Sequence, residues 1–152
     1  MIAIDTSVWV EYINTGGVFH PQAKAVIDSL GKGGTEAILT PITLAEIYYV
    51  SERVYKEAYT AQESEALAKK LYDFVYYYYH PHVEIKELDY ELCLKAAMIK
   101  STYKIAISDC FLFALSEKEN VAILFRGKEK EMEPNIKELK NHFNLKFLEE
   151  YR

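Results

Sequence analysis

Short apolar segments alternate with longer amphipathic segments along the whole sequence. Residues 1–4, 37–39 and 121–125 are apolar and uncharged, 83–88 alternates apolar with charged side chains, and 145–148 is again mostly apolar. Strands with uncharged cores suit a sheet that is buried on both faces, and such sheets are parallel, with helices between the strands. We therefore predict an α/β fold with a parallel central sheet flanked by helices on both faces, in a single domain over residues 1–152.

Capping residues predict where the helices begin. Thr6 is a suitable N-cap for a helix over 7–14, and Thr40 stands in the same position before Pro41. Thr60 is followed three residues later by glutamate, which is the spacing of a capping box at the start of a long helix reaching Val75. Further helices are predicted over residues 21–30, 90–99, 111–116 and 134–143.

Neither the cysteines nor the hydropathy of the sequence points to secretion or to a membrane. Cys93 and Cys110 have apolar neighbours and no second cysteine or histidine at a zinc-ligand spacing, so we expect two buried free thiols. No apolar run approaches the roughly 20 residues that a membrane-spanning helix needs, and no basic stretch leads into an apolar run near residue 1. We therefore expect a cytoplasmic protein with no membrane contact.

Three acids stand in apolar surroundings rather than on a solvated surface. Asp5 directly follows the first predicted strand, and Asp109 precedes the apolar helix that begins at Phe111. Glu46 is the only charge between Glu36 and Glu52. In a parallel α/β sheet, side chains that follow the strands or begin the helices gather at the carboxyl edge, where ligands bind. We expect these three acids to meet there.

Each acid also has a structural interpretation. Asp5 could simply cap the first helix, and Asp109, with Ser108 as the more natural cap, could favour the helix dipole. Glu46 has the weakest alternative, because no polar residue continues its helix face until Ser51. Crowded carboxylates repel one another unless a hard cation joins them, and oxygen ligands select Mg²⁺ or Mn²⁺. The three together predict an acidic metal site.

In these segments the sequence resembles the PIN-domain nucleases, especially the VapC-like toxins of prokaryotic toxin–antitoxin pairs. The matching segments are MIAIDTSVW at 1–9, TPITLAEI at 40–47, SDCFLFAL at 108–115 and the strand at 121–125. They follow the family order and spacing over essentially the whole chain. A haloacid-dehalogenase-like phosphatase would need a second Asp two residues after Asp5, where Ser7 stands.

The resemblance implies a site and an activity. Asp5, Glu46 and Asp109 match the first three acids of the family, and Thr6 matches the hydroxyl residue after the first. The family places a fourth acid after the fourth strand, where this chain reads Phe-Arg-Gly-Lys-Glu at 125–129. Glu129 could reach the site from its shifted position, or three acids could suffice. The number of metal ions therefore stays open.

The activity implied is metal-dependent hydrolysis of RNA phosphodiester bonds by an activated water. Two ions could hold the attacking and leaving oxygens, whereas one would activate water and polarise the phosphate. Asp5 and Asp109 would be direct ligands, and Glu46 a ligand or a base that orients water. The resemblance also implies a small antitoxin protein as partner. The alternative is a PIN-like binding or scaffold module that lost catalysis with the fourth acid.

Two further surfaces could bind partners. The net charge of -5 argues against an overall positive field, so contacts to RNA phosphates would be local, through Arg126, Lys128 and Lys130. Glutamates alternate with these residues, and an ordinary solvated loop is an equal interpretation. VapC-like proteins are typically dimers, and we expect a homodimer through the tyrosine-rich helices within residues 41–79, since Tyr is enriched at interfaces.

Overall fold

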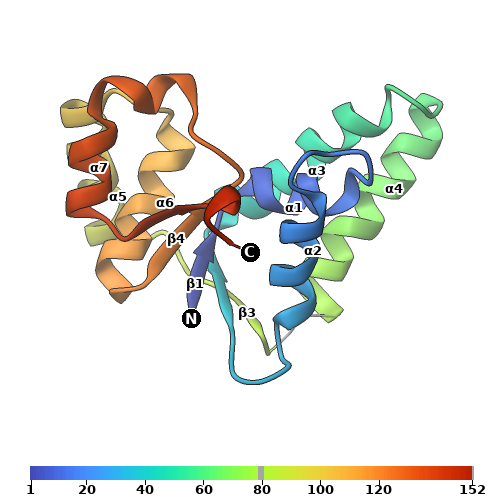
Figure 1. Cartoon of the computed structure of the whole chain (residues 1–152), viewed down its shortest axis with the longest axis horizontal. Coiled ribbons are helices and arrows are strands. Elements are labelled where there is room, and N and C mark those ends of the chain that lie inside the picture. Colours follow the sequence, from blue (N-terminus) through green and yellow to red (C-terminus); the bar gives the residue numbers. More distant parts are fainter. Residues whose placement is uncertain (79–80, 152) are drawn as a thin grey trace.

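A five-stranded parallel sheet forms the centre of the molecule (Figure 1). The structure is a computed structural model and describes residues 1–78 and 81–151. Its strands follow the order β3-β2-β1-β4-β5, with Ile2 of β1 aligned between Ala37 of β2 and Ala122 of β4. The strands are β1 (Ile2–Ile4), β2 (Ala37–Leu39), β3 (Val83–Ile85), β4 (Ala122–Phe125) and β5 (Leu145–Phe147). All five predicted strands are confirmed, and β3 is shorter than predicted.

Helices connect the strands and cover both faces of the sheet, as predicted. The α-helices are α1 (Thr6–Ile13), α2 (His20–Ser29), α3 (Pro41–Tyr55), α4 (Ala61–Asp73), α5 (Tyr90–Tyr103), α6 (Ile107–Glu119) and α7 (Ile136–His142). Short helices of other types are the π-helix η1 (Phe74–Tyr78) and the 3₁₀ helices η2 (Lys130–Asn135) and η3 (Leu148–Glu150). The long pair α3 and α4 extends away from the sheet on the right of Figure 1.

Two hydrophobic clusters lie on opposite faces of the sheet because successive strand residues point in opposite directions. Ala3 packs in the cluster formed with α5, α6 and α7. Its neighbours Ile2 and Ile4 pack in the other cluster, with apolar residues of α1, α2, α3 and α4. This alternation explains why the central strands β1, β2 and β4 carry no charges, whereas β3 and β5 at the edges of the sheet each carry one. No helix of the described residues is long and apolar enough to cross a membrane.

Several helix ends differ from the sequence prediction. Asp5, rather than Thr6, is the N-cap of α1, because its extended backbone lets the carboxylate accept the Ser7 N–H, and Thr6 lies inside the helix. The helix holding Asp109 begins at Ile107, so Ser108 is a first-turn residue and no cap. The caps at Thr40, Thr60 and Asp89 are confirmed.

Other differences concern the tyrosine segment, the region of Pro134 and one cysteine. The helix that begins at Thr60 changes to a π-helix at Phe74, and Tyr79, part of the predicted dimer face, lies outside the described residues. Pro134 falls in the 3₁₀ helix η2, so the α-helical part begins later, at Ile136. Cys110 is buried, but Cys93 is exposed on α5 because its side chain points away from the sheet.

Candidate active site

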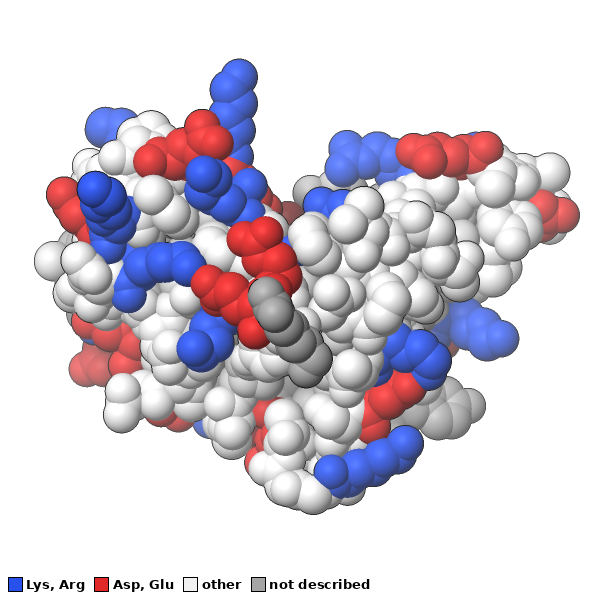
Figure 2. Space-filling model, viewed as in Figure 1, with Lys and Arg blue, Asp and Glu red and all other residues white. Residues whose placement is uncertain are grey.

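The predicted acids lie at one edge of the sheet, beyond the central strands. Asp5 directly follows β1, and Glu129 follows β4, the neighbour of β1. Asp109 lies in the first turn of α6, and Glu46 lies early in α3. The order of the strands reverses between β1 and β4, and this is where α/β sheets form ligand crevices. Figure 1 shows β1 pointing to this edge, and Figure 2 shows a hollow there between the α3–α4 pair and the rest of the molecule.

Asp5 is buried and held by Ser7. Its carboxylate accepts hydrogen bonds from the Ser7 backbone N–H at 2.8 Å and from the Ser7 hydroxyl at 2.5 Å. Burial raises the pKa of Asp5, and the bonds from Ser7 and from the Thr6 backbone N–H oppose that rise because they favour the charged form. Asp5 is therefore both a helix cap and a fixed, inward-facing carboxylate. The two interpretations of the sequence are compatible.

Glu46 joins α3 to the start of α1. The Thr6 hydroxyl donates to its Oε1 at 3.4 Å. Burial raises the pKa of Glu46, the negative charge of Asp5 raises it further, and hydrogen bonds from Ser108, Thr6 and Tyr49 lower it. The charge of Asp5 acts on Glu46, so the two carboxylates lie near each other, and three hydroxyl groups orient Glu46.

Asp109 and Glu129 form a pair of carboxyl groups. Asp109 is only 6% exposed, and burial followed by the negative charges of Asp5 and Glu129 raises its pKa to about 9. A hydrogen bond joins the Asp109 and Glu129 side chains, and the pKa of Glu129 is also raised, first by burial and then by Asp5. Two carboxyl groups can hydrogen-bond only if one carries a proton, so the pair shares one at neutral pH. Glu129 therefore reaches the acidic cluster.

The cluster has the donor chemistry of a magnesium site but is not an assembled cage. Within residues 1–78 and 81–151, no three His, Cys, Asp or Glu side chains converge closely enough to hold a metal ion as they stand. The main influences on the four pKa values include no lysine or arginine. Oxygen donors without a basic partner suit Mg²⁺ or Mn²⁺, and an ion would have to draw the side chains together and displace the shared proton.

Arg126 is half-exposed, and its guanidinium is bound to Glu11 of α1 rather than free to contact RNA. Its Nε donates to Glu11 Oε2 at 2.6 Å, and its guanidinium lies over the Phe19 ring at 5.4 Å from the centroid. Glu11 is only 3% exposed, and its Oε1 accepts the Phe19 backbone N–H at 2.8 Å. Lys128 is exposed and pairs with Glu133 at 3.6 Å, and Lys130 is exposed too. On the face shown in Figure 2 basic and acidic side chains are mixed.

Sequence reasoning missed Ser7 and Glu11, which attach the loop after β4 to α1. The Ser7 hydroxyl donates to Asp5 and accepts the Arg126 backbone N–H at 3.0 Å, so it lies between the first acid and the loop that carries Glu129. The signal for Glu11 was available, since it is a charge next to Trp9 on the inward face of a helix. Nothing in the sequence showed that its partner lies 115 residues away.

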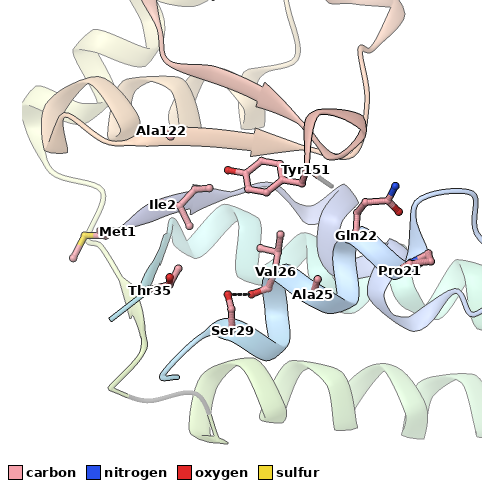
Figure 3. Close-up of a pocket in the computed structure, with 10 residues that line it drawn as sticks. All are labelled: Met1, Ile2, Pro21, Gln22, Ala25, Val26, Ser29, Thr35, Ala122 and Tyr151. Carbon is pink, nitrogen blue, oxygen red and sulfur yellow. Dashed lines mark hydrogen bonds between the residues drawn. The ribbon is translucent and has the colours of Figure 1, made fainter. Parts of the chain in front are cut away.

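A separate cavity of about 640 Å³ lies at the opposite edge of the sheet, near Met1 (Figure 3). It is lined by the starts of strands and by α2, with Gln22, Val26 and Tyr151 among its residues. None of the described residues that line it is an Asp, Glu, His, Lys or Arg. This cavity therefore contributes none of the acids of the candidate site.

Known proteins share both the sequence pattern and the fold. Residues 2–131 match the PIN domain family model, and no curated protein matches the chain. Similar solved structures are the sarcin-ricin-loop-cleaving toxin VapC20 of Mycobacterium tuberculosis (15% identity, TM-score 0.64, covering 89% of this chain and 95% of that one) and VapBC2 of Rickettsia felis bound to a promoter DNA fragment (16%, 0.61, 97% and 98%). FitAcB of Neisseria gonorrhoeae is also similar (20%, 0.59, 84% and 88%). Since the family model covers most of its length, the chain belongs to the PIN-domain family.

Proposed function

We propose that the protein is a metal-dependent endoribonuclease that uses Mg²⁺ or Mn²⁺, and that it is the toxin of a toxin–antitoxin pair. The observation that carries the proposal is the approach of four carboxyl groups, from distant parts of the sequence, at a buried edge; among the described residues, no lysine or arginine is a main influence on their pKa values. Such a cluster is costly unless a cation binds. Asp5, Glu46 and Asp109 would hold the ion, and Glu129 would replace the missing fourth acid.

The residues of the site would divide the work. A bound divalent ion lowers the pKa of water and neutralises charge on the phosphate. Asp5, fixed by two hydrogen bonds from Ser7, would be a ligand that needs no rearrangement. Glu46 is held by hydroxyl groups and has a raised pKa, which suits a base that accepts a proton from the attacking water. Asp109 and Glu129 would have to lose their shared proton before they could bind an ion.

The comparisons support RNA as substrate and an antitoxin as partner. One similar structure is described as a toxin that cleaves the sarcin-ricin loop, and another is a toxin–antitoxin complex from Klebsiella pneumoniae at 13% identity. Such low identities show the fold alone, so both assignments belong to the proposal. The alternative is a PIN-like scaffold module without activity. The absence of an assembled cage among the described residues favours that alternative, and metal titration distinguishes the two.

The test measures Mn²⁺ binding by calorimetry and cleavage of single-stranded and structured RNA. Asp5→Asn is better than alanine, because asparagine caps helices as well as aspartate does and only the charge is lost. Asp5→Asn and Asp109→Asn should abolish cleavage and weaken Mn²⁺ binding with the fold intact, and Glu129→Gln should reduce both. Asp28→Asn removes a carboxylate that pairs with Lys24 on the surface and should change neither.

Two results would count against the nuclease. Cleavage that survives in both Asp5→Asn and Asp109→Asn would contradict the assignment of the site. A wild-type protein that neither binds Mn²⁺ nor cleaves RNA would support the scaffold. Neutralisation of cleavage by a small DNA-binding protein encoded beside this gene would support the toxin role, which is tested separately from the chemistry.

A further inference from the structure

Helix α3 carries an exposed aromatic residue beside the acidic cluster. Tyr49 follows Glu46 by three positions, and its hydroxyl donates a hydrogen bond to the Glu46 carboxylate. Long side chains of a helix lean toward its N-terminus, so the ring lies over the turn that bears Glu46. Tyr49 is nevertheless 53% exposed. The hydroxyl end of this residue therefore holds an acid of the site, while much of the ring is open to solvent.

Tyr49 differs from the other exposed tyrosines of the described chain. It is the one among them whose hydroxyl binds an acid of the site. Tyr76 packs against Tyr77, and Tyr59 packs against Tyr55. No ring of the described residues packs on Tyr49 in this way. An aromatic ring with an open face, next to groups that would cleave a phosphodiester, is a platform on which a nucleobase can stack.

A basic residue continues the same face of α3. Arg53 follows Tyr49 by four positions, so the two side chains are neighbours on the helix surface, about 6 Å apart along its axis. Arg53 is exposed and forms no ion pair with any residue that the structure describes, whereas Lys56, three positions later, is paired with Glu52. Figure 2 shows basic side chains on the α3–α4 pair, next to the hollow. The Arg53 guanidinium is therefore available to a phosphate group.

We propose that Tyr49 and Arg53 form a track for single-stranded RNA along α3, in which a base beside the reacting phosphate stacks on Tyr49 and a neighbouring phosphate binds Arg53. This inference rests on the proposed nuclease function, because it names how the same site holds its substrate. Stacking accepts every base, and a contact to phosphate reads no sequence. Bases inside a duplex are already stacked on their neighbours. The α3 track therefore selects an unpaired strand rather than a particular sequence.

The hydroxyl and the ring of Tyr49 should affect cleavage differently. Tyr49→Phe keeps the ring but loses the hydrogen bond to Glu46, so it should lower kcat about two- to tenfold and leave KM unchanged. Tyr49→Leu loses both and should also raise KM at least about fivefold, since stacking on an aromatic ring is worth about 1 kcal/mol or more per base. A residue that only supported the helix would not separate KM from kcat in this way.

RNA that lacks a single base tests the stacking directly. Steady-state cleavage of a single-stranded oligonucleotide with Mn²⁺ is measured with an abasic nucleotide at each position around the cleavage site in turn. For the wild type, one abasic position should raise KM as much as Tyr49→Leu does, and combining the two changes should add nothing, because both remove the same contact. The matched control Tyr90→Leu removes a ring that is 82% exposed on α5 and should leave KM unchanged.

Salt dependence tests Arg53. Binding of the labelled oligonucleotide is followed by fluorescence anisotropy in EDTA, where no metal supports cleavage. Arg53→Gln should weaken binding and reduce the slope of log K against log salt by about 0.7, the contribution of one phosphate contact on a single strand. The matched control Lys32→Gln removes an exposed lysine from the loop before β2, at the opposite edge of the sheet, and should leave the slope unchanged. Tyr49→Leu should weaken this binding as well.

The outcomes separate the α3 track from the nuclease. If the wild type cleaves RNA and Tyr49→Leu has the same KM as Tyr49→Phe, the track is overturned and the nuclease stands. If the protein binds RNA through Tyr49 in EDTA but cleaves none with Mn²⁺, the track stands and the nuclease is overturned. A wild type that does not bind RNA overturns both. Thermal melting and sedimentation velocity should show that Tyr49→Leu keeps the fold and oligomeric state, and a changed oligomeric state would place Tyr49 in a subunit interface and overturn the track.

Discussion

Replacing Arg126 with methionine should destabilise the protein by leaving Glu11 buried without its charged partner. The Glu11 carboxylate is only 3% exposed and keeps one donor, the Phe19 backbone N–H, after the guanidinium is removed. Breaking a fully buried ion pair costs about 3–5 kcal/mol, and a surface pair is worth about 0–1 kcal/mol. Since the Arg126 side chain is 43% exposed, we expect an intermediate loss of about 2 kcal/mol. For a chain of this size that is a fall of about 4–8 °C in melting temperature.

A second substitution tests whether the charges of Glu11 and Arg126 are coupled. Glu11→Gln alone should destabilise the wild type, because it removes the charge that Arg126 binds. In the Arg126→Met background the same change should restore about 1 kcal/mol, since glutamine still accepts the Phe19 N–H and no unpaired charge stays buried. The sign of the Glu11→Gln effect therefore reverses between the two backgrounds.

Urea unfolding of the four proteins in this cycle, followed by circular dichroism, measures the coupling. Lys128→Met is the matched control in the same loop, because its partner Glu133 lies 3.6 Å away and both side chains are about half exposed; it should change stability by less than about 0.5 kcal/mol. If Glu11→Gln destabilises the Arg126→Met protein as much as the wild type, the pair is not coupled and the reasoning is refuted.

Two further predictions concern Gly17 and Asp109. Gly17→Ala would place a methyl group 2.2 Å from Glu11 Oε1, and hydrogen bonds from Phe19 and Arg126 hold the Glu11 carboxylate in place. We therefore expect urea unfolding to show a loss of about 1–3 kcal/mol in the free energy of unfolding. In the control Gly16→Ala the methyl group meets no atom within 4 Å, and the loss should be under about 0.5 kcal/mol. Because the pKa of Asp109 is raised to about 9, this group stabilises the metal-free fold fully below its unfolded pKa and loses that effect as the pH rises toward about 9. The melting temperature in EDTA should therefore fall between about pH 6 and pH 9, Mg²⁺ should stabilise the protein more at the upper pH, and a melting temperature in EDTA that rises over this range would contradict the raised pKa.

Local sequence patterns predicted the sheet and the places of three acids. Uncharged segments such as 37–39 become strands because only apolar side chains fit between two layers of helices. Caps at Thr40 and Asp89 were recognisable because a cap binds N–H groups two or three residues along the chain. Asp5, Glu46 and Asp109 were identified from their apolar neighbours. The parallel topology of the sheet then brings these three acids to the same edge.

Contacts between residues that are far apart in the sequence could not be predicted from it. The bond between Ser7 and Arg126 depends on β1 and β4 being neighbours, which a list of strands does not state. Arg126 resembled an RNA-binding residue because its partner Glu11 belongs to a distant helix. Whether Glu129 joins the site depends on how the loop after β4 turns toward Asp109, and the number of residues in the loop did not decide this. Even the cap of α1 was assigned one residue late, because Asp5 and Thr6 have similar preferences.

The four acids of the site are stabilised next to one another in two different ways, and the difference determines which of them must change when an ion binds. Asp5 and Glu46 accept hydrogen bonds from hydroxyl and backbone donors, which favour the charged form and partly oppose the effect of burial on their pKa values. Asp109 and Glu129 instead lower their mutual repulsion by sharing a proton. Asp109 and Glu129 would have to release that shared proton before they bind a cation. The Ser7 hydroxyl binds both Asp5 and the backbone of Arg126, at the start of the loop that carries Glu129. This one hydroxyl group therefore links Asp5 to the loop of Glu129. Affinity for the ion would then rise with pH, because the pKa values of all four acids are raised and an ion binds their charged forms.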